Sequence, residues 1–319
     1  IKKIGLTALA GSLVATSAFA GELTASGSAS MSIKNTTDNN VLALDATKGG
    51  DSSTGKAVSM ANSVYLAGSG EMDNGLTVSM SFEMDQGAAN NSSNGFDNHY
   101  VEVGSDALGT LRLSGHGGSS AQSAMDTTAA GDLWNNTLGL DGGVAAAAAG
   151  DNSFFYTLPE MMDGVAITAS MSPGRAAQET HTSYGLVYTG VEGLTVKFGQ
   201  GDSGAPAAEI ESTTMMASYA IGSFTVSASN TDASKTGAAD REVSSFQIAY
   251  TVSDNISLTY GEETFDLSDN AVDEETSGFG ASYTTGGMTL SAQTYKAEGV
   301  SLTAGAETEK WALTAAFAF

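Results

Sequence analysis

Cysteine is absent from the 319-residue sequence. Without it the chain has no disulfide, no thiolate zinc ligand, no cysteine nucleophile and no cysteine that could carry a lipid. The phosphate-binding motif G-x-x-x-x-G-K-[ST] and the zinc-protease motif H-E-x-x-H are also missing. These absences remove several common classes of catalytic site, and we predict that the protein is not an enzyme.

Basic residues are scarce. Twelve Lys and Arg stand against 36 Asp and Glu, which gives a formal net charge of −24. So acidic a chain repels the phosphate backbone, and we expect no nucleic-acid partner. The chain is nevertheless 41% hydrophobic, with twelve Phe and ten Tyr, which is too rich for a disordered protein.

Proline is rare as well, with three residues against 39 glycines. That balance favours β-strands separated by glycine-containing turns over helices. A chain of this length suggests about two domains, although all-β barrels of the same size form one.

Long apolar runs are missing, and the only membrane-targeting pattern lies at the start. Lys2 and Lys3 precede a short apolar stretch over 4–14, and Ala18-Phe19-Ala20 forms an A-x-A cleavage site before Gly21. The apolar stretch is shorter than the roughly 20 residues that a spanning helix needs. We therefore predict a cleaved signal peptide over 1–20 and a single β-barrel domain over 21–319.

Apolar and polar residues alternate with a period of two along much of the chain. The pattern is clear over 22–34, 76–85 and 194–198, where Leu, Val, Met, Phe or Ala alternate with Ser, Thr, Glu or Lys. Such alternation predicts strands with one apolar and one wet face.

The connections between these segments alternate between short and long. Seven short ones lie at 72–75, 105–109, 160–164, 190–193, 220–223, 253–256 and 284–287. Eight long ones lie near 35–56, 86–98, 117–151, 173–181, 202–211, 232–240, 266–275 and 297–308. The sequence thus predicts an all-β fold, a transmembrane antiparallel barrel of about sixteen strands with a water-filled lumen.

Several stretches resemble the general, non-specific outer-membrane porins of Gram-negative bacteria. They are "HYVEVGSDALGTLRLSG" (99–115), "NSFFYTLPEMMDGVAITASMSP" (152–173) and the final aromatics Phe317 and Phe319. The short length and the acidity look most like the alphaproteobacterial members. The resemblance implies a homotrimer in the outer membrane, surrounded by lipid and lipopolysaccharide, and an assembly signal at Phe317 and Phe319 that the barrel-assembly machinery reads.

The resemblance also implies that the third long loop, here 117–151, folds inward and narrows the pore. Its charges are all negative: Asp126, Asp132, Asp141 and Asp151. The alternation places further acids, Glu83 and Glu102, on inward faces, together with the basic residues Arg112, Lys197, Lys34 and Lys310. Charged rings lower the barrier for ions of opposite sign. Because the positive wall is thin, we predict a passive diffusion channel for ions and small hydrophilic solutes that prefers cations.

Other interpretations stay open. A secreted acidic adhesin or surface-layer protein would share the signal peptide and composition, and a substrate-specific sugar porin would share the barrel. The 117–151 loop could also be a solvated acidic surface loop.

The cluster Asp266, Asp269, Asp273 and Glu274 offers oxygen ligands for structural Ca²⁺, although a solvated loop is the simpler reading; no other cofactor is expected. "GDSGAP" (201–206) resembles the serine motif of trypsin-like proteases, but Gly, Asp, Ser and Pro are also the residues most common in turns, which explains the match.

Overall fold

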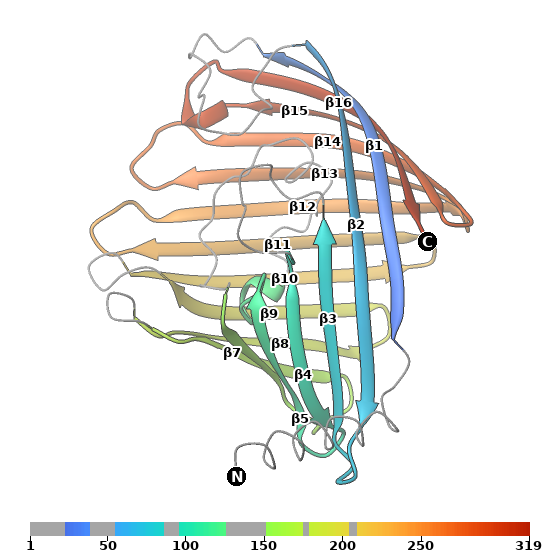
Figure 1. The fold of residues 1–319 in the computed structure, drawn as a ribbon. Helices are drawn as coiled ribbons and strands as arrows, with labels where there is room; N and C mark the ends of the chain where they lie inside the picture. Colours follow the sequence, from blue (N-terminus) through green and yellow to red (C-terminus); the bar gives the residue numbers. More distant parts are fainter. Residues whose placement is uncertain (1–22, 39–54, 86–95, 126–150, 175–178, 204–208) are drawn as a thin grey trace.

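A computed structural model describes residues 23–38, 55–85, 96–125, 151–174, 179–203 and 209–319. These residues form sixteen antiparallel strands in one closed barrel, in which every strand pairs with its neighbours in sequence and β1 pairs with β16 (Figure 1). The predicted fold class and strand number are thereby confirmed.

The strands are β1 (Thr24–Asp38), β2 (Gly55–Glu71), β3 (Thr77–Asp85), β4 (His99–Ser105), β5 (Gly109–His116), β6 (Ser153–Thr157), β7 (Val165–Ser172), β8 (His181–Val191), β9 (Leu194–Ser203), β10 (Ile210–Ile221), β11 (Phe224–Lys235), β12 (Arg241–Ser253), β13 (Ile256–Leu267), β14 (Glu274–Thr285), β15 (Met288–Glu298) and β16 (Glu307–Ala318). Within the described ranges they are accompanied by two single-turn 3₁₀ helices, η2 (Ser123–Met125) and η4 (Val300–Leu302). In the described part of the chain no helix is long and apolar enough to cross a membrane.

The alternating side-chain pattern gives the barrel two different surfaces. One face of each strand carries exposed apolar residues, such as Val58 on β2, Met215 on β10 and Leu313 on β16. The other face carries mostly Ser, Thr and Gly, many of them buried, including Ser183, Ser212, Thr214 and Thr231. An exposed apolar outer wall with a polar interior is what lipid outside and water inside require.

Tight turns join the strands at one edge of the barrel. Gly75, in the β2–β3 turn, adopts φ 80°, a left-handed conformation that costs glycine little. The last strand joins this edge too, because the N–H of Ala318 donates to the carbonyl of Gly287 in the β14–β15 turn at 2.8 Å. The predicted short connections therefore lie together at the edge that holds Thr24 and Phe319.

The barrel closes between its first and last strands. β1 and β16 pair from Ser28 with Ala318 through Asp38 with Thr308, and Ile33 lies opposite Leu313 on the outer face. Trp311, Leu313 and Phe317 form the outward row of β16, and all three are exposed. No free sheet edge remains at this seam, which is the condition for a sheet to be stable in lipid.

Candidate functional site

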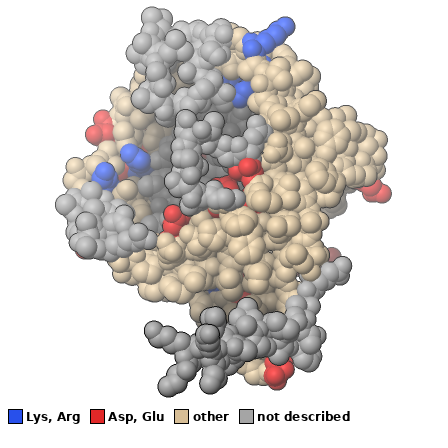
Figure 2. All heavy atoms as spheres, in the orientation of Figure 1, with Lys and Arg blue, Asp and Glu red and all other residues tan. Residues whose placement is uncertain are grey.

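The inner wall is lined by small hydroxyl side chains that hydrogen-bond across strands. Ser229 and Ser245 lie 2.7 Å apart between β11 and β12, and Ser257 and Ser282 lie 2.7 Å apart between β13 and β14. Cross-strand hydroxyl pairs of this kind satisfy the polar atoms without filling the interior. On the face seen in Figure 2, several acidic and basic side chains lie around the recessed centre of the view, while broad stretches of the surface carry no charge.

Residues 117–125, the first part of the 117–151 loop, pack against this inner wall. The N–H of Ala121 donates to Ser170 Oγ on β7 at 2.9 Å, and the N–H of Gln122 donates to Ser183 Oγ on β8 at 3.3 Å. The side chain of Gln122 continues to β10, where its Nε2 donates to Thr214 Oγ1 at 2.6 Å. The beginning of the loop therefore lies inside the barrel, on inward-facing residues of three strands.

Two glycines make room for this segment. Gly185 on β8 and Gly199 on β9 are directly opposite each other, and we call them the glycine notch. A Cβ on Gly185 would lie 2.8 Å from the carbonyl oxygen of Ala121, and one on Gly199 would lie 2.9 Å from Gln122 Cα. Because neither approach leaves space for a methyl group, the notch allows η2 to lie directly on the wall, with Gln122 fully buried.

The predicted acidic residues fall into different environments. Asp126, Asp132 and Asp141 lie outside the described residues. Asp151 is exposed, with Oδ1 3.6 Å from His116 Nε2, and Asp97 Oδ1 approaches the other ring nitrogen of His116 at 3.8 Å. His116 thus lies between the end of the loop and the residues that precede β4.

Glu102 and Arg112 face inward, as the alternation predicts, and they form an ion pair. They are directly opposite in the β4–β5 register, and Arg112 Nε donates to Glu102 Oε2 at 2.9 Å. The guanidinium carbon of Arg112 also lies 4.0 Å from the ring centroid of Tyr100. Both charges therefore largely offset each other at the wall. Glu83 is inward too, but buried, with 8% exposure.

The remaining predicted basic residues also share inward faces. Lys34 is opposite Ala57 and Ala312, and Lys197 is opposite Met216. Lys310 is buried and lies 5.9 Å from the ring centroid of Tyr295. Sequence reasoning missed two more, Lys235 and Arg241, which continue the inward sets of β11 and β12 at their long-loop ends. Strand parity could have located both, but their position at strand ends hid them among the loop residues.

Much of the acidic charge lies outside the barrel instead. Two rows of acidic residues lie on the outer face, which also carries the exposed apolar residues. In one row, Asp232, Glu242 and Asp266 are register partners across β11, β12 and β13. In the other, Glu275, Glu298 and Glu307 are register partners across β14, β15 and β16. The net charge of the chain is therefore a poor measure of the charge that a solute meets inside.

The predicted calcium ligands are partly brought together. Asp266 and Asp273 interact through their side chains, while Glu274 Oε2 accepts the N–H of Ser301 at 2.9 Å. Among the described residues, no group of three or more His, Asp or Glu side chains is arranged to hold a metal ion. Calcium binding at residues 266–274 stays a prediction.

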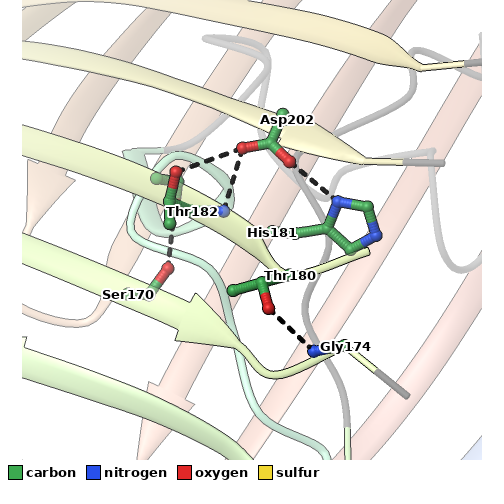
Figure 3. A network of polar contacts seen from close by, with 7 residues as sticks. Ser170, Gly174, Thr180, His181, Thr182 and Asp202 are labelled. Atoms are coloured by element: carbon green, nitrogen blue, oxygen red, sulfur yellow. Dashed lines mark hydrogen bonds and ion pairs between the residues drawn. The ribbon is translucent and has the colours of Figure 1, made fainter. Parts of the chain in front are cut away.

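A compact polar network joins the long-loop ends of β8 and β9 (Figure 3). His181 Nδ1 and Asp202 Oδ2 lie 2.7 Å apart, and Asp202 Oδ1 accepts hydrogen bonds from the N–H and the hydroxyl of Thr182 at 2.9 and 3.2 Å. Asp202 belongs to the "GDSGAP" stretch, and its carboxylate here ties two strand ends together. This contact gives the stretch a structural role.

Three solved structures with the same fold are distant from this chain in sequence. An anion-selective porin from Comamonas acidovorans is 12% identical, with a TM-score of 0.69 over 93% of this chain and 99% of that one. OmpT, an outer membrane protein of Vibrio cholerae, is 13% identical, with a TM-score of 0.67 over 93% and 97%. A mutant of the Rh. blastica porin is 13% identical, with a TM-score of 0.64 over 93% and 100%.

None of the curated proteins matches the chain. The expected likeness to alphaproteobacterial members in particular stays a prediction. The family model of the Gram-negative porins, by contrast, matches residues 5–319, which is nearly the whole sequence. Together with the closed barrel and its polar interior, this match shows that the chain belongs to the Gram-negative porin family and is an outer-membrane porin channel.

Proposed function

We propose that the protein is a passive diffusion channel for ions and small hydrophilic solutes, that it prefers cations, and that no bond is made or broken during transport. The observation that carries the proposal is the polar inner wall against which residues 117–125 pack. A loop that enters a wide barrel narrows the water-filled path, so solutes are sorted there by size and charge.

The cation preference rests on the loop and the wall considered together. Residues 117–151 contain four aspartates and no lysine or arginine. On the wall beside the loop, Arg112 is paired with Glu102 and offers little free positive charge. Lys197, Lys235 and Arg241 act in the opposite sense, and the preference is therefore expected to be moderate. The anion selectivity named for the Comamonas acidovorans porin does not transfer at 12% identity.

Export and assembly follow the same proposal. Residues 1–20 act as a cleaved signal peptide, with Ala18 and Ala20 before the cleavage site and Gly21 as the first mature residue. The barrel inserts with the help of the assembly machinery and forms a homotrimer surrounded by lipid and lipopolysaccharide. The exposed apolar outer wall, including Ile33, Val58 and Met60, supports a membrane or a second subunit as its neighbour.

Planar-bilayer recording of the detergent-extracted protein tests the channel directly. We expect stepwise increases in current. We also expect liposomes that contain the protein to swell in solutions of small sugars and to stop swelling when the sugar is too large to pass the pore. A folded barrel that gives no current steps would contradict the proposal and would favour the alternative of a secreted adhesin or surface-layer protein. Saturable, sugar-specific block of the current would instead favour a substrate-specific sugar porin.

A further inference from the structure

Glu83 occupies an unusual position for a pore-lining carboxylate, because both of its side-chain oxygens are already bound. Oε1 accepts the hydroxyl of Tyr65 at 2.6 Å, and Oε2 accepts Nδ2 of Asn98 at 2.5 Å. Tyr65 lies directly opposite Glu83 in the β2–β3 register. Only 8% of Glu83 is exposed. The carboxylate is therefore built into the wall between β2, β3 and the residues that precede β4.

Asn98 links this carboxylate to the start of the 117–151 loop. Its backbone carbonyl accepts the N–H of Glu83 at 2.7 Å, which fixes the main chain, and its Nδ2 is held by Glu83 Oε2. The opposite side of the amide faces Gly117, because a Cβ on Gly117 would lie within 1.5 Å of Asn98 Oδ1. Glu83 thereby decides which side of the Asn98 amide meets Gly117.

Gly117 is the residue at which the chain leaves the wall. β5 ends at His116, and Gly117 turns away with φ 68°, a conformation that strongly favours glycine. Four residues later Ala121 bonds to Ser170 on the inner face of β7. The direction of the chain at Gly117 thus sets how residues 118–125 approach the glycine notch.

We propose that Glu83 is a positioning residue for residues 117–125, the described beginning of the loop, acting through Asn98 and Gly117, and not a charge that selects ions. This inference rests on the proposed function, in which that loop narrows the pore. The hydrogen-bond chemistry is specific: Tyr65 and Asn98 both present donors, so position 83 must offer two acceptors. Glutamine offers only one acceptor oxygen, so in Glu83→Gln the Tyr65 hydroxyl must turn and accept a hydrogen bond from the new amide, and both charge-assisted hydrogen bonds are lost.

Substitutions that separate charge from geometry test the inference. Tyr65→Phe removes one hydrogen bond to Glu83 and changes no charge, whereas Glu83→Gln changes both. Asp85→Asn is the matched control, because Asp85 lies two residues further along β3 on the same face and is exposed. Each variant is first checked for a folded barrel by its mobility in unheated detergent gels, and single-channel currents are then recorded in symmetric and graded KCl.

We expect Tyr65→Phe and Glu83→Gln to switch more often between conductance levels, with a roughly fivefold rise in the time spent in altered levels, the factor that one lost hydrogen bond gives. Asp85→Asn should keep the steady current of the wild type, and Glu83→Gln should shift the reversal potential less than Asp85→Asn does. Asn98→Ala is the second variant if Glu83→Gln does not fold, and it should resemble Tyr65→Phe.

A quiet Tyr65→Phe channel together with a Glu83→Gln reversal potential shifted as far as that of Asp85→Asn would overturn the inference and make Glu83 a selecting charge. Such a result would leave the proposed function intact, since the wild type would still conduct. If the folded wild type forms no channel, the proposed function fails instead, so the two failures are distinguishable.

Discussion

The ring of Phe319 lies across Gly27 on the outer side of the barrel seam. The two residues exchange backbone hydrogen bonds, from Gly27 N–H to Phe319 O at 2.6 Å and from Phe319 N–H to Gly27 O at 2.9 Å. A Cβ on Gly27 would lie 2.6 Å from Phe319 Cε2. The small residue on β1 therefore makes the space in which the last aromatic ring sits. A lipid-facing ring at the closing strand pair joins the predicted assembly signal to barrel closure.

Phe319→Ala should lower the yield of inserted barrel in cells much more than it lowers stability. The ring is 77% exposed, so its loss should change the free energy of unfolding by only about 0.5 kcal/mol. The comparison needs two measurements, the amount of folded protein in outer membranes and the urea midpoint of barrels refolded in detergent. Normal membrane yield from Phe319→Ala would show that Phe319 is not read during assembly.

Gly27→Val provides the complementary test at the same contact, because its side chain would displace the ring while Phe319 remains in the sequence. We expect reduced yield from Gly27→Val. Gly68→Ala is the control on β2, since a Cβ there meets Leu23 Cδ1 at an ordinary 3.7 Å. Equal yields from both variants would mean that the position of the ring is irrelevant.

Gly199→Ala should release the beginning of the 117–151 loop from the wall. The added methyl group meets Met125 Cγ at 2.8 Å and Gln122 Cα at 2.9 Å, so the backbone of the loop must move. Overpacking of this kind costs about 1–3 kcal/mol. We expect a changed and noisier single-channel conductance, measured against wild type and Gly68→Ala. An unchanged conductance would mean that residues 117–125 do not control the narrowest part of the pore.

Gln122→Ala removes the hydrogen bond to Thr214 without adding volume. Thr214 Oγ1 keeps a partner, because Thr231 Oγ1 lies 3.0 Å away, and the barrel should therefore remain closed. Loss of a hydrogen bond whose remaining partner stays paired costs about 0.5–1.5 kcal/mol. We expect single-channel current noise like that of Gly199→Ala and a modest drop in the urea midpoint. A change in conductance opposite in direction to that of Gly199→Ala would argue that the two variants do not act through the same displacement of the loop.

Asp202→Ala should destabilise the joined ends of β8 and β9. It removes three hydrogen-bonded contacts, to His181, to the N–H of Thr182 and to the hydroxyl of Thr182. A loss of about 1–3 kcal/mol in the free energy of unfolding is expected. Glu211→Ala is the control, because Glu211 lies opposite Asp202 on β10 and is exposed. Equal urea midpoints for the two variants would contradict the structural role of the network.

The period of two made the barrel predictable from the sequence. Leu111 and Leu113 flank Arg112, and that simple alternation placed the arginine inward, opposite Glu102. Alternation works because lipid and water impose opposite requirements on the two faces of every strand. The order of short and long connections then gave the strand number, since each turn type recurs at one edge of the barrel.

The details of the site depend on contacts that alternation cannot reveal. Gly185 and Gly199 look like any glycines on a polar face, and only the approach of Gln122 shows that their missing side chains matter. Glu83 was placed on the correct face, but its burial depends on Asn98, fifteen residues away across a connection. His181 and Asp202 likewise meet only because β8 and β9 pair. Such partners are set by register and loop path, which residue patterns do not encode locally.

Glu102 and Arg112 should act on ion preference in opposite directions. Arg112→Ala leaves the Glu102 carboxylate without its 2.9 Å partner and should raise the preference for cations, whereas Glu102→Gln leaves the guanidinium and should lower it. The double variant should return close to wild type. Reversal potentials in graded KCl check this, and the differences should shrink near 1 M salt, where the Debye length falls to about 3 Å. Shifts of the same sign in both single variants would refute the assigned roles.

The reversal potential of the wild-type channel in a KCl gradient tests the central claim most directly. Recorded in a planar bilayer at low ionic strength, it should have the sign of a membrane more permeable to K⁺ than to Cl⁻. The charged residues of the 117–151 loop are all aspartates, and Arg112 on β5 is paired with Glu102. A reversal potential of the opposite sign would contradict the proposed preference. It would mean that the basic residues Lys197, Lys235 and Arg241 determine the ion preference of the pore instead.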